Sequence, residues 1–496
     1  MGLTTAHLSF GMFKSRGVAL AIALMLTTAV LTLAPASANA ENVRDTLAQA
    51  YRYNPRLDAE RARLRATDED VDQATAGFRP RLTFQGDVGH QDNETTFKQG
   101  AGNFNNSSGQ SDPRGYSFQA TQSLFKGFQT LNAVNEAEAA VRAGRETLRN
   151  VEQEVLLAAV ESYGNVVRDT AIVRLRENNV NVLQSELKAT QDRFAVGEVT
   201  RTDIAQAQAR RAAAVSELDL ARATLKSSRA TYEQTVGSPP SNLAEPKPET
   251  KIVPHSLNEA IGISAKENPN VVAALYREQA ARFTVDRIRG ELLPEAQLEA
   301  TYSDRYNSST QVDRTESGQV VARFSMPIYE GGEIYSRVRQ AKHTQVSRIQ
   351  EIEQQRAQAQ QIVVQAWSQL QAAKAQLISD KAQIEANTTA LQGTREEEKV
   401  GQRTLLDVLN AQQELLISQV QVESTKRNIL FFSYSVVSGI GRLNVQEVGA
   451  VSTVYDPVVH HDEVARKWWG LDITRDDGTT EHVDAWQGRV EHEPVK

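Results

Sequence analysis

The 496-residue chain contains no cysteine, which excludes a disulfide framework and any cysteine-ligated zinc or iron–sulfur site. Positive charge is not in excess either, because the formal net charge is −7. This argues against a protein that binds nucleic acid through a basic surface. Proline is scarce and unevenly placed, since none of the 14 lies between Pro113 and Pro239 or between Pro327 and Pro457. Two proline-free stretches of similar length predict long helices and indicate a duplicated chain.

The sequence also lacks the motifs of common enzymes, since it contains no G-x-S-x-G, H-E-x-x-H or P-loop. His460 and His461, followed by Asp462 and Glu463, are a candidate metal site. Adjacent histidines lack the spacing of a dedicated site, so we interpret them as part of a surface tail. We expect no metal, no cofactor and no enzymatic activity.

The N-terminus has the pattern of a secretory signal. A basic stretch at 14–16 precedes an uncharged apolar run at 18–34, and Ala38-Asn39-Ala40 follows as a cleavage site. The alternative, a membrane anchor, is disfavoured because the run is short for a helical span of ~20 residues. We expect residues 1–40 to be a signal peptide and the mature chain to begin at Glu41, and we exclude a helical membrane protein.

The mature chain contains an internal repeat. Asn54-Pro55 recurs as Asn268-Pro269, and Val196-Gly197 recurs as Val400-Gly401. The Asn-Pro match has an offset of 214 residues, and the matches from Gly127 onward share an offset of 204, which chance does not produce over a long stretch. The predicted organisation is a first repeat at 41–240, a proline-rich linker at 241–255, a second repeat at 256–446 and a C-terminal periplasmic tail at 447–496.

The hydrophobic period changes in the same order in each repeat. Spacings of three and four residues predict helices, and alternation after Pro80 and Pro294 predicts β-strands. The first repeat is predicted to contain a helix at 45–77, a β-hairpin at about 81–125 with a polar loop at 91–115, a long helix at 127–195, a turn at 196–203 and a helix at 201–236. The second is predicted to contain a helix at 257–290, a β-hairpin at about 295–329 with a polar loop at 303–318, a long helix at 332–399, a turn at 400–407 and a helix at 404–438.

The strands indicate a membrane part that several chains share. Alternating strands of ~9–11 residues, long polar loops and an export signal are typical of an outer-membrane β-barrel. One chain supplies four strands, whereas the smallest such barrels close with about eight, because an open edge is not tolerated in lipid. One alternative is a soluble periplasmic coiled-coil adaptor or scaffold protein, in which the hairpins form a β-domain. Another is a periplasmic hydrolase.

The two Asn-Pro pairs, the prolines before the strands, the glycines after the return strands and the Val-Gly turns occur twice in one order. In this order they resemble the TolC family of outer-membrane efflux and type I secretion channels, over about residues 43–446. The resemblance implies a mainly α, mixed α/β membrane protein that forms a homotrimer. Three chains would share a 12-stranded barrel within outer-membrane lipid and a coiled-coil-like helical barrel in the periplasm.

The resemblance also implies a function. Channels of this family passively conduct drugs, toxic compounds or secreted proteins to the cell exterior. A periplasmic adaptor (membrane fusion) protein and an inner-membrane ABC or RND transporter would complete the complex. The sequence names neither the cargo nor the particular pump.

Gating residues follow from the resemblance one position at a time. Asp407 matches the first of two acidic rings at a periplasmic constriction, and Asn410 stands at the second, which predicts weaker cation selectivity. Arg403 matches a basic residue that links to Thr202 and Asp203 of the neighbouring coil. The remaining position matches the tyrosine of that latch and is occupied here by Glu398.

The resemblance also implies that the two Val-Gly turns lie at the periplasmic tip of the tunnel and that the adaptor docks there. The expected docking residues surround the two Val-Gly pairs: Val196, Gly197, Glu198 and Thr200 in the first turn, and Val400, Gly401, Gln402 and Thr404 in the second. The role of the tail stays open between packing around the middle of the tunnel, binding a partner and partial disorder. Its Trp468-Trp469 pair favours an ordered contact.

Overall fold

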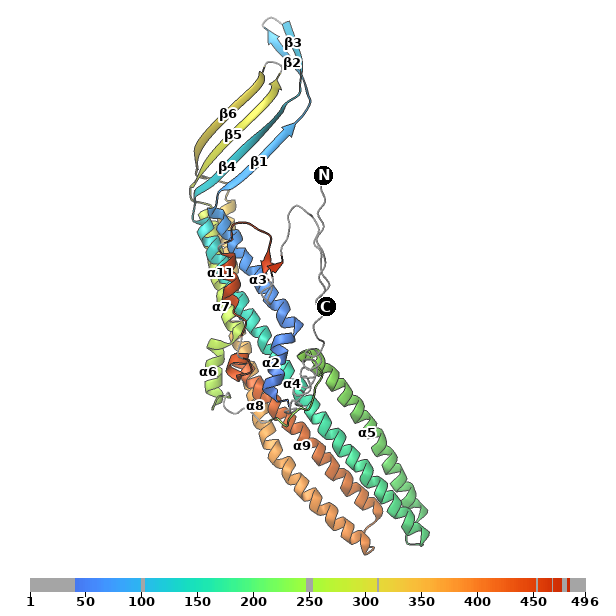
Figure 1. The fold of residues 1–496 in the computed structure, drawn as a ribbon. Coiled ribbons are helices and arrows are strands. Elements are labelled where there is room, and N and C mark those ends of the chain that lie inside the picture. The colour runs from blue at the N-terminus through green and yellow to red at the C-terminus, as the bar shows by residue number, and fades with distance from the viewer. Residues whose placement is uncertain are drawn as a thin grey trace, which may run out of the picture.

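The structure, a computed structural model, describes residues 41–99, 103–246, 253–309, 312–451, 454–465, 467–474 and 480–481. The expected signal peptide, part of the linker and the end of the tail lie outside the described residues. Figure 1 shows an elongated molecule with a β-sheet at one end, a bundle of helices in the middle and two helical hairpins at the other end.

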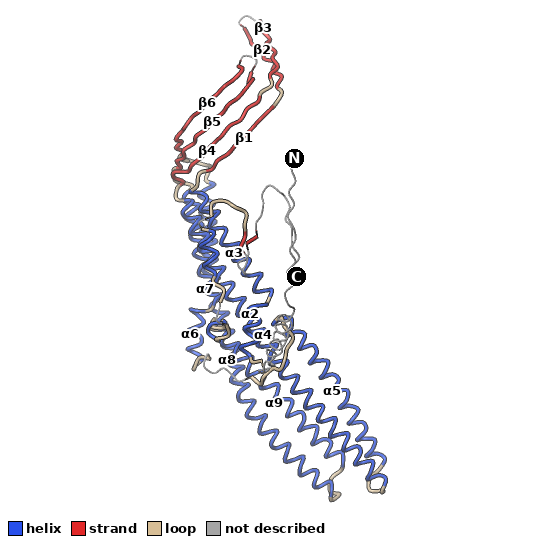
Figure 2. The backbone as a smooth tube through the Cα atoms, viewed as in Figure 1, coloured by secondary structure: helices blue, strands red, loops and turns tan. Residues whose placement is uncertain are grey.

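The elements of the two halves follow the same order, helices at one end and strands at the other (Figure 2). The first half contains α2 (Val43–Tyr53), α3 (Pro55–Thr75), the 3-10 helix η1 (Ala76–Phe78), β1 (Arg81–Val88), β2 (Gln91–Gln99), β3 (Asn103–Ser111), β4 (Arg114–Lys126), α4 (Gln129–Ala195) and α5 (Arg201–Val236). The second contains α6 (Leu257–Glu267), α7 (Pro269–Gly290), β5 (Glu295–Ser309), β6 (Val312–Ser325), α8 (Glu333–Lys399) and α9 (Leu405–Gly439). The C-terminal segment adds α10 (Val445–Val448), α11 (Pro457–Val464), β7 (Ile473–Thr474) and β8 (Thr480–Glu481).

The two longest helices, α4 and α8, have 67 residues each. At 1.5 Å per residue each is ~100 Å long. Both are rich in strong helix formers and contain no proline. The buried residues of α8 include a series at spacings of seven, four and three: Ile352, Ala359, Val363, Ala366, Leu370 and Ala373. So narrow a stripe packs helices side by side instead of around a thick core. None of the described helices carries an apolar stretch long enough to cross a membrane.

The single helices predicted at 45–77 and 257–290 are each divided at their Asn-Pro pair. Proline has no N–H group with which to continue the preceding helix, but it is well suited to the first turn of a new one. Asn54 therefore ends α2 and begins α3, and Asn268 does the same between α6 and α7. Both asparagines have an extended backbone at the joint. The prediction of uninterrupted helices at these two places was wrong.

Both asparagines also bond to the end of a distant helix. The side-chain oxygen of Asn54 accepts from the backbone two residues on, while its Nδ2 donates to the Thr235 carbonyl at 2.8 Å. The side chain of Asn268 does the same and donates to the Gly439 carbonyl at 3.0 Å. The joints therefore lie against the ends of α5 and α9.

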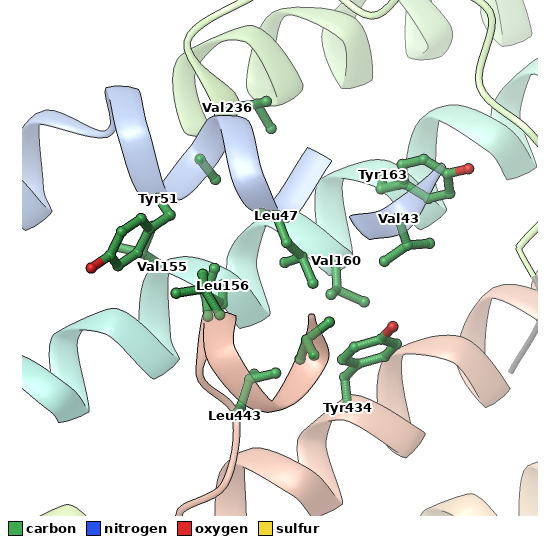
Figure 3. Close-up of a cluster of buried hydrophobic side chains, with 14 of the residues drawn as sticks. Val43, Leu47, Tyr51, Val155, Leu156, Val160, Tyr163, Val236, Tyr434 and Leu443 are labelled. Carbon is green, nitrogen blue, oxygen red and sulfur yellow. The ribbon is translucent and has the colours of Figure 1, made fainter. Parts of the chain in front are cut away.

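A large apolar cluster lies where α2, α4, α9 and the end of α5 meet (Figure 3), in the region between the sheet and the tips (Figure 1). Leu47, Leu156, Val160 and Tyr163 are fully buried in it. The hydroxyl of Tyr163 donates to the Ala244 carbonyl at 2.6 Å, which holds the start of the linker against the core. Burial raises the pKa of Tyr163 to about 12, so the hydroxyl keeps its proton.

Four strands form one antiparallel sheet in the order β1-β4-β5-β6, which confirms the predicted two pairs of alternating strands. The register places Phe84, Phe118, Tyr302 and Gly318 in one row across the sheet. The next row holds Thr83, Gln119, Thr301 and Gln319. Because side chains alternate between the faces of a strand, the sheet has one apolar and one polar face.

The predicted polar loops are partly strands, so that prediction was wrong. Within 91–115, β2 and β3 pair with each other from Gln91 and Ser111 to Gln99 and Asn103. In the second hairpin β5 continues to Ser309 and β6 begins at Val312. An antiparallel ladder is formed by backbone hydrogen bonds and does not require apolar side chains on either face. A two-stranded ribbon with polar side chains on both faces therefore shows no alternation of apolar and polar residues in its sequence.

Candidate functional site at the helical tips

The turns between α4 and α5 and between α8 and α9 have the same construction. Gly197 (φ 81°) and Gly401 (φ 78°) have left-handed backbones, and their N–H groups donate to carbonyls three residues back. A Cβ atom at either glycine would meet nothing within 4 Å. The positive φ, and not a close approach, therefore requires glycine here.

The eight residues predicted for adaptor docking all lie exposed in these two turns or at the first residue before the next helix. Val196 and Val400 are both 72% exposed. An isolated exposed valine is ordinary on a protein surface, but here the same apolar side chain stands at the same place in both turns. The tips therefore present two equivalent surfaces.

Each turn leads into a helix through a capping box. Asp203 accepts from the backbone N–H and the hydroxyl of Thr200, both at 2.8 Å. Asp407 accepts from the same groups of Thr404, at 3.0 and 2.8 Å. The Thr200 donors lower the pKa of Asp203, and the Thr404 donors lower that of Asp407. Both carboxylates therefore stay ionised near neutral pH.

Arg403 lies in the second turn and bonds to its own hairpin. Its Nε donates to Glu397 at 2.9 Å, and this hydrogen bond raises the pKa of the guanidinium. The resemblance predicted a contact from Arg403 to Thr202 and Asp203. In the described chain Arg403 bonds to Glu397 and the side chain of Asp203 caps α5, so the structure does not bring these predicted latch residues together.

One link between the two hairpins within the chain is an ion pair that the sequence did not predict. Arg193 near the end of α4 donates to Glu398 near the end of α8 at 2.7 Å, and it also contacts Glu198 at 3.3 Å. The Glu398 bond raises the pKa of Arg193. Arg193 and Glu397 occupy equivalent positions in the two repeats and carry opposite charges. This reversal of charge was the only sign in the sequence that an ion pair could join the two hairpins.

Asn410, the residue at the predicted second ring, also forms a contact that the sequence did not reveal. Arg210 of α5 donates to the side-chain oxygen of Asn410 in α9. Beneath the tips, α4, α5 and α9 share an apolar cluster of Leu183, Leu187, Ala207, Ala214, Leu405 and Leu409. The chain therefore brings Asn410, Asp407 and a cation together at the start of α9.

A comparison with known families adds to this geometry. The profile of the family described as outer membrane efflux protein matches residues 46–238 and 260–430. The outer membrane efflux protein BepC of Brucella suis is 34% identical over 469 residues, which cover 93% of this chain and 98% of BepC. The outer membrane protein TolC of Escherichia coli is 25% identical over 427 residues, covering 83% of this chain and 85% of TolC.

Solved structures agree on the fold. The CmeC outer membrane channel of Campylobacter jejuni superposes with a TM-score of 0.71 at 15% identity, covering 86% of this chain and 89% of CmeC. At such low identity the similarity concerns the fold alone.

Proposed function

Because the chain belongs to the outer membrane efflux protein family, the family of TolC, we propose that it works as a homotrimer with a gate at the tips of its α4–α5 and α8–α9 hairpins. The chain is an outer-membrane efflux or secretion channel with a periplasmic tunnel, which confirms the predicted function and location. Members of the family are transport channels and not enzymes. The alternative of a soluble adaptor or scaffold is not favoured.

The two-faced sheet is the observation that supports a shared barrel best. Four strands in register offer one apolar face to lipid and one polar face to water. The outer edges, β1 and β6, have no strand beside them within the part of the chain that the structure describes. Unpaired backbone groups are too costly in lipid to remain open, so each edge pairs with that of another copy. Three copies give 12 strands.

The tips supply the gate of this trimer. Asp407 of each chain stands at the constriction, so three ionised carboxylates would attract cations. Asn410 at the second ring binds Arg210, and this cation weakens the cation preference further. Arg403 would link to Thr202 and Asp203 of the neighbouring coil through the N–H groups of its guanidinium that are not bonded to Glu397.

The exposed turns are the proposed docking surface for a periplasmic adaptor of a tripartite complex. Val196 and Val400 would enter apolar pockets of the adaptor, while Glu198 and Gln402 give polar contacts around them. An ABC or RND transporter in the inner membrane would supply the energy. Replacing both valines by aspartate should abolish cross-linking to the adaptor and leave the amount of channel in the outer membrane unchanged.

Conductance in planar bilayers tests the gate. Glu398→Gln weakens the pair with Arg193, and Arg403→Ser removes the proposed link to Thr202 and Asp203, so both should raise the conductance of the purified channel several-fold. Arg63→Ser is the matched control, because Arg63 also forms an exposed ion pair but lies on α3 far from the tips. Absence of conductance in the wild type and in every variant would contradict a gated channel.

A further inference from the structure

The C-terminal segment follows α3 from the middle of the molecule to the base of the sheet (Figure 1). Near the start of α3, the backbone N–H of Tyr455 donates to the hydroxyl of Tyr51 at 3.0 Å. Near the other end, Arg79 donates to the Lys467 carbonyl at 3.3 Å. Arg79 lies two residues before β1, so the segment reaches the level at which the helices pass into strands.

Several contacts hold the segment in place. The guanidinium of Arg61 lies 4.7 Å from the ring centre of Tyr51 and 5.3 Å from that of Tyr455. In α11, His460 lies 3.1 Å from the carboxylate of Asp68, which is fully buried. Val464 of α11 is also buried. The segment is therefore attached along the whole of α3.

At its upper end this attached segment turns large apolar side chains outward. The Arg79 guanidinium lies 5.0 Å from the ring centre of Trp468, yet Trp468 is still 64% exposed and Trp469 is 88% exposed. Leu471 and Phe78 beside them are also exposed. Nothing within the described chain covers this group of side chains.

The apolar face of the sheet continues to the same level. Asp304 lies on the same face as Tyr302 and marks the upper limit of the apolar surface. Both oxygens of its carboxylate accept from Arg314, each at 3.0 Å. From Asp304 down to Ala296, at the base of β5, the strand rises about 27 Å at ~3.4 Å per residue. With strands tilted ~40°, this is a height of about 21 Å, short of the ~25 Å apolar band of an outer-membrane barrel.

The missing height is supplied at the junction between strands and helices. Phe125 and Phe128 are exposed there and touch edge to face, with ring centres 5.1 Å apart. Phe125 pairs with Ala296, in the last row but one of the sheet. The lower edge of the apolar band therefore lies at or just below this row, which is the level of Arg79 and Trp468.

We propose that Trp468 and Trp469 lie in the headgroup region of the periplasmic leaflet, so that the C-terminal segment anchors the helical part to the bilayer surface. Tryptophan suits this region because its ring is apolar while its N–H requires a polar partner. Arg79 keeps Trp468 at this height, and an ion pair with Asp72 of α3 in turn holds the Arg79 guanidinium in place. The proposal rests on the outer-membrane location of the channel and not on its gate.

The absence of cysteine makes the position of the pair measurable. A nitroxide on Trp469→Cys, in the full-length channel in phosphatidylethanolamine and phosphatidylglycerol vesicles, reports its accessibility to oxygen and to a water-soluble nickel chelate. Leu82→Cys on the apolar face is the control for lipid, and Val459→Cys on α11 is the control for water. The ratio of oxygen to nickel accessibility at 469 should exceed that at 459 several-fold and approach that at 82.

Two results would overturn the proposal. A ratio equal to that at 459 places the tryptophans in water, and low accessibility to both reagents places them against a neighbouring chain. A second measurement leaves both tryptophans in place: in Trp367→Phe/Trp486→Phe, lipids brominated near the headgroups should quench the remaining fluorescence more strongly than those brominated at the chain ends. Adding Arg79→Gln should reduce that quenching, whereas Arg63→Gln should not change it.

Discussion

At the scale of single residues, Asn54 and Asn268 do the same work in the two halves of the chain. Each ends one helix, begins the next and bonds to the end of a tip helix, so one side chain fixes three segments. The Asn-Pro pairs were visible in the sequence as a repeat. Their bonds to Thr235 and Gly439 were not, because the partners lie more than 150 residues away and backbone carbonyls leave no mark in a sequence.

Two substitutions at Asn54 separate its roles. Asn54→Ala removes the cap of α3 and the bond to Thr235, while Asn54→Asp keeps the cap and loses the donor to Thr235. A lost cap costs about 1 kcal/mol, so amides in the first turn of α3 should exchange about fivefold faster in the alanine variant alone. Amides near the end of α5 should exchange faster in both. Equal exchange of the α3 amides in the two variants would refute the capping role.

The capping carboxylates of the tips predict a pH dependence. The pKa values of Asp203 and Asp407 are lowered in the fold from the usual 3.8, so their contribution to stability is complete above that value. It is lost as the pH falls through the lowered values. Hydrogen-exchange protection at the starts of α5 and α9 should therefore decrease in strong acid. Asp203→Asn should remove the effect from α5 and leave it in α9, and a pH-dependent loss that persists at α5 would contradict this.

Arg210 and Asp407 predict opposite changes in ion selectivity. Removing the cation beside the constriction with Arg210→Gln should increase the preference for cations, and Asp407→Asn should decrease it. Reversal potentials under a salt gradient measure both. Arg211→Gln removes an exposed charge from the neighbouring position and should leave the selectivity unchanged. A shift of the same sign in Arg210→Gln and Asp407→Asn would contradict the assignment of the ring.

At the scale of elements, the sequence predicted the long helices and the strands because each has a period that side chains reveal. The bounds of α5 match the predicted 201–236, and those of α4 differ from 127–195 at the start alone. Two elements left no such period. β2 and β3 consist mostly of Asn, Ser, Thr, Gly and Gln, and both faces of such a ribbon tolerate water. Arg193 and Glu398 were missed as a pair because only the tertiary packing of α4 and α8 brings them together.

The β2–β3 ribbon is expected to be dispensable for assembly. It pairs with itself, and the four-stranded sheet keeps its own register from Val88 and Arg114 downward. Replacing residues 91–111 by a short turn should leave the heat resistance of the extracted oligomer unchanged. As a contrast, Phe118→Asp puts a charge in the middle of the apolar face and should prevent the oligomer from appearing in outer-membrane fractions. Loss of the oligomer on deleting the ribbon would show that the ribbon joins neighbouring chains.

At the scale of the whole molecule, one chain is incomplete. In the described residues the sheet has two edges without a neighbouring strand, and the helices pack through narrow stripes of apolar side chains. Apolar side chains are also exposed on the strands and at the junction between strands and helices. A single copy cannot enclose water on one side and exclude it on the other. The proposed trimer accounts for these features through contacts between neighbouring chains. β1 pairs with β6 of the next copy, and the tip helices of the chains meet at the other end of the molecule.

The number of chains in the assembled channel tests this account most directly. Native mass spectrometry of the protein extracted from outer membranes in detergent measures it without reference to any gate or cargo. A homotrimer predicts a mass of three chains, which would together supply the 12 strands of the barrel. A single chain, or any other number as the sole species, would contradict it.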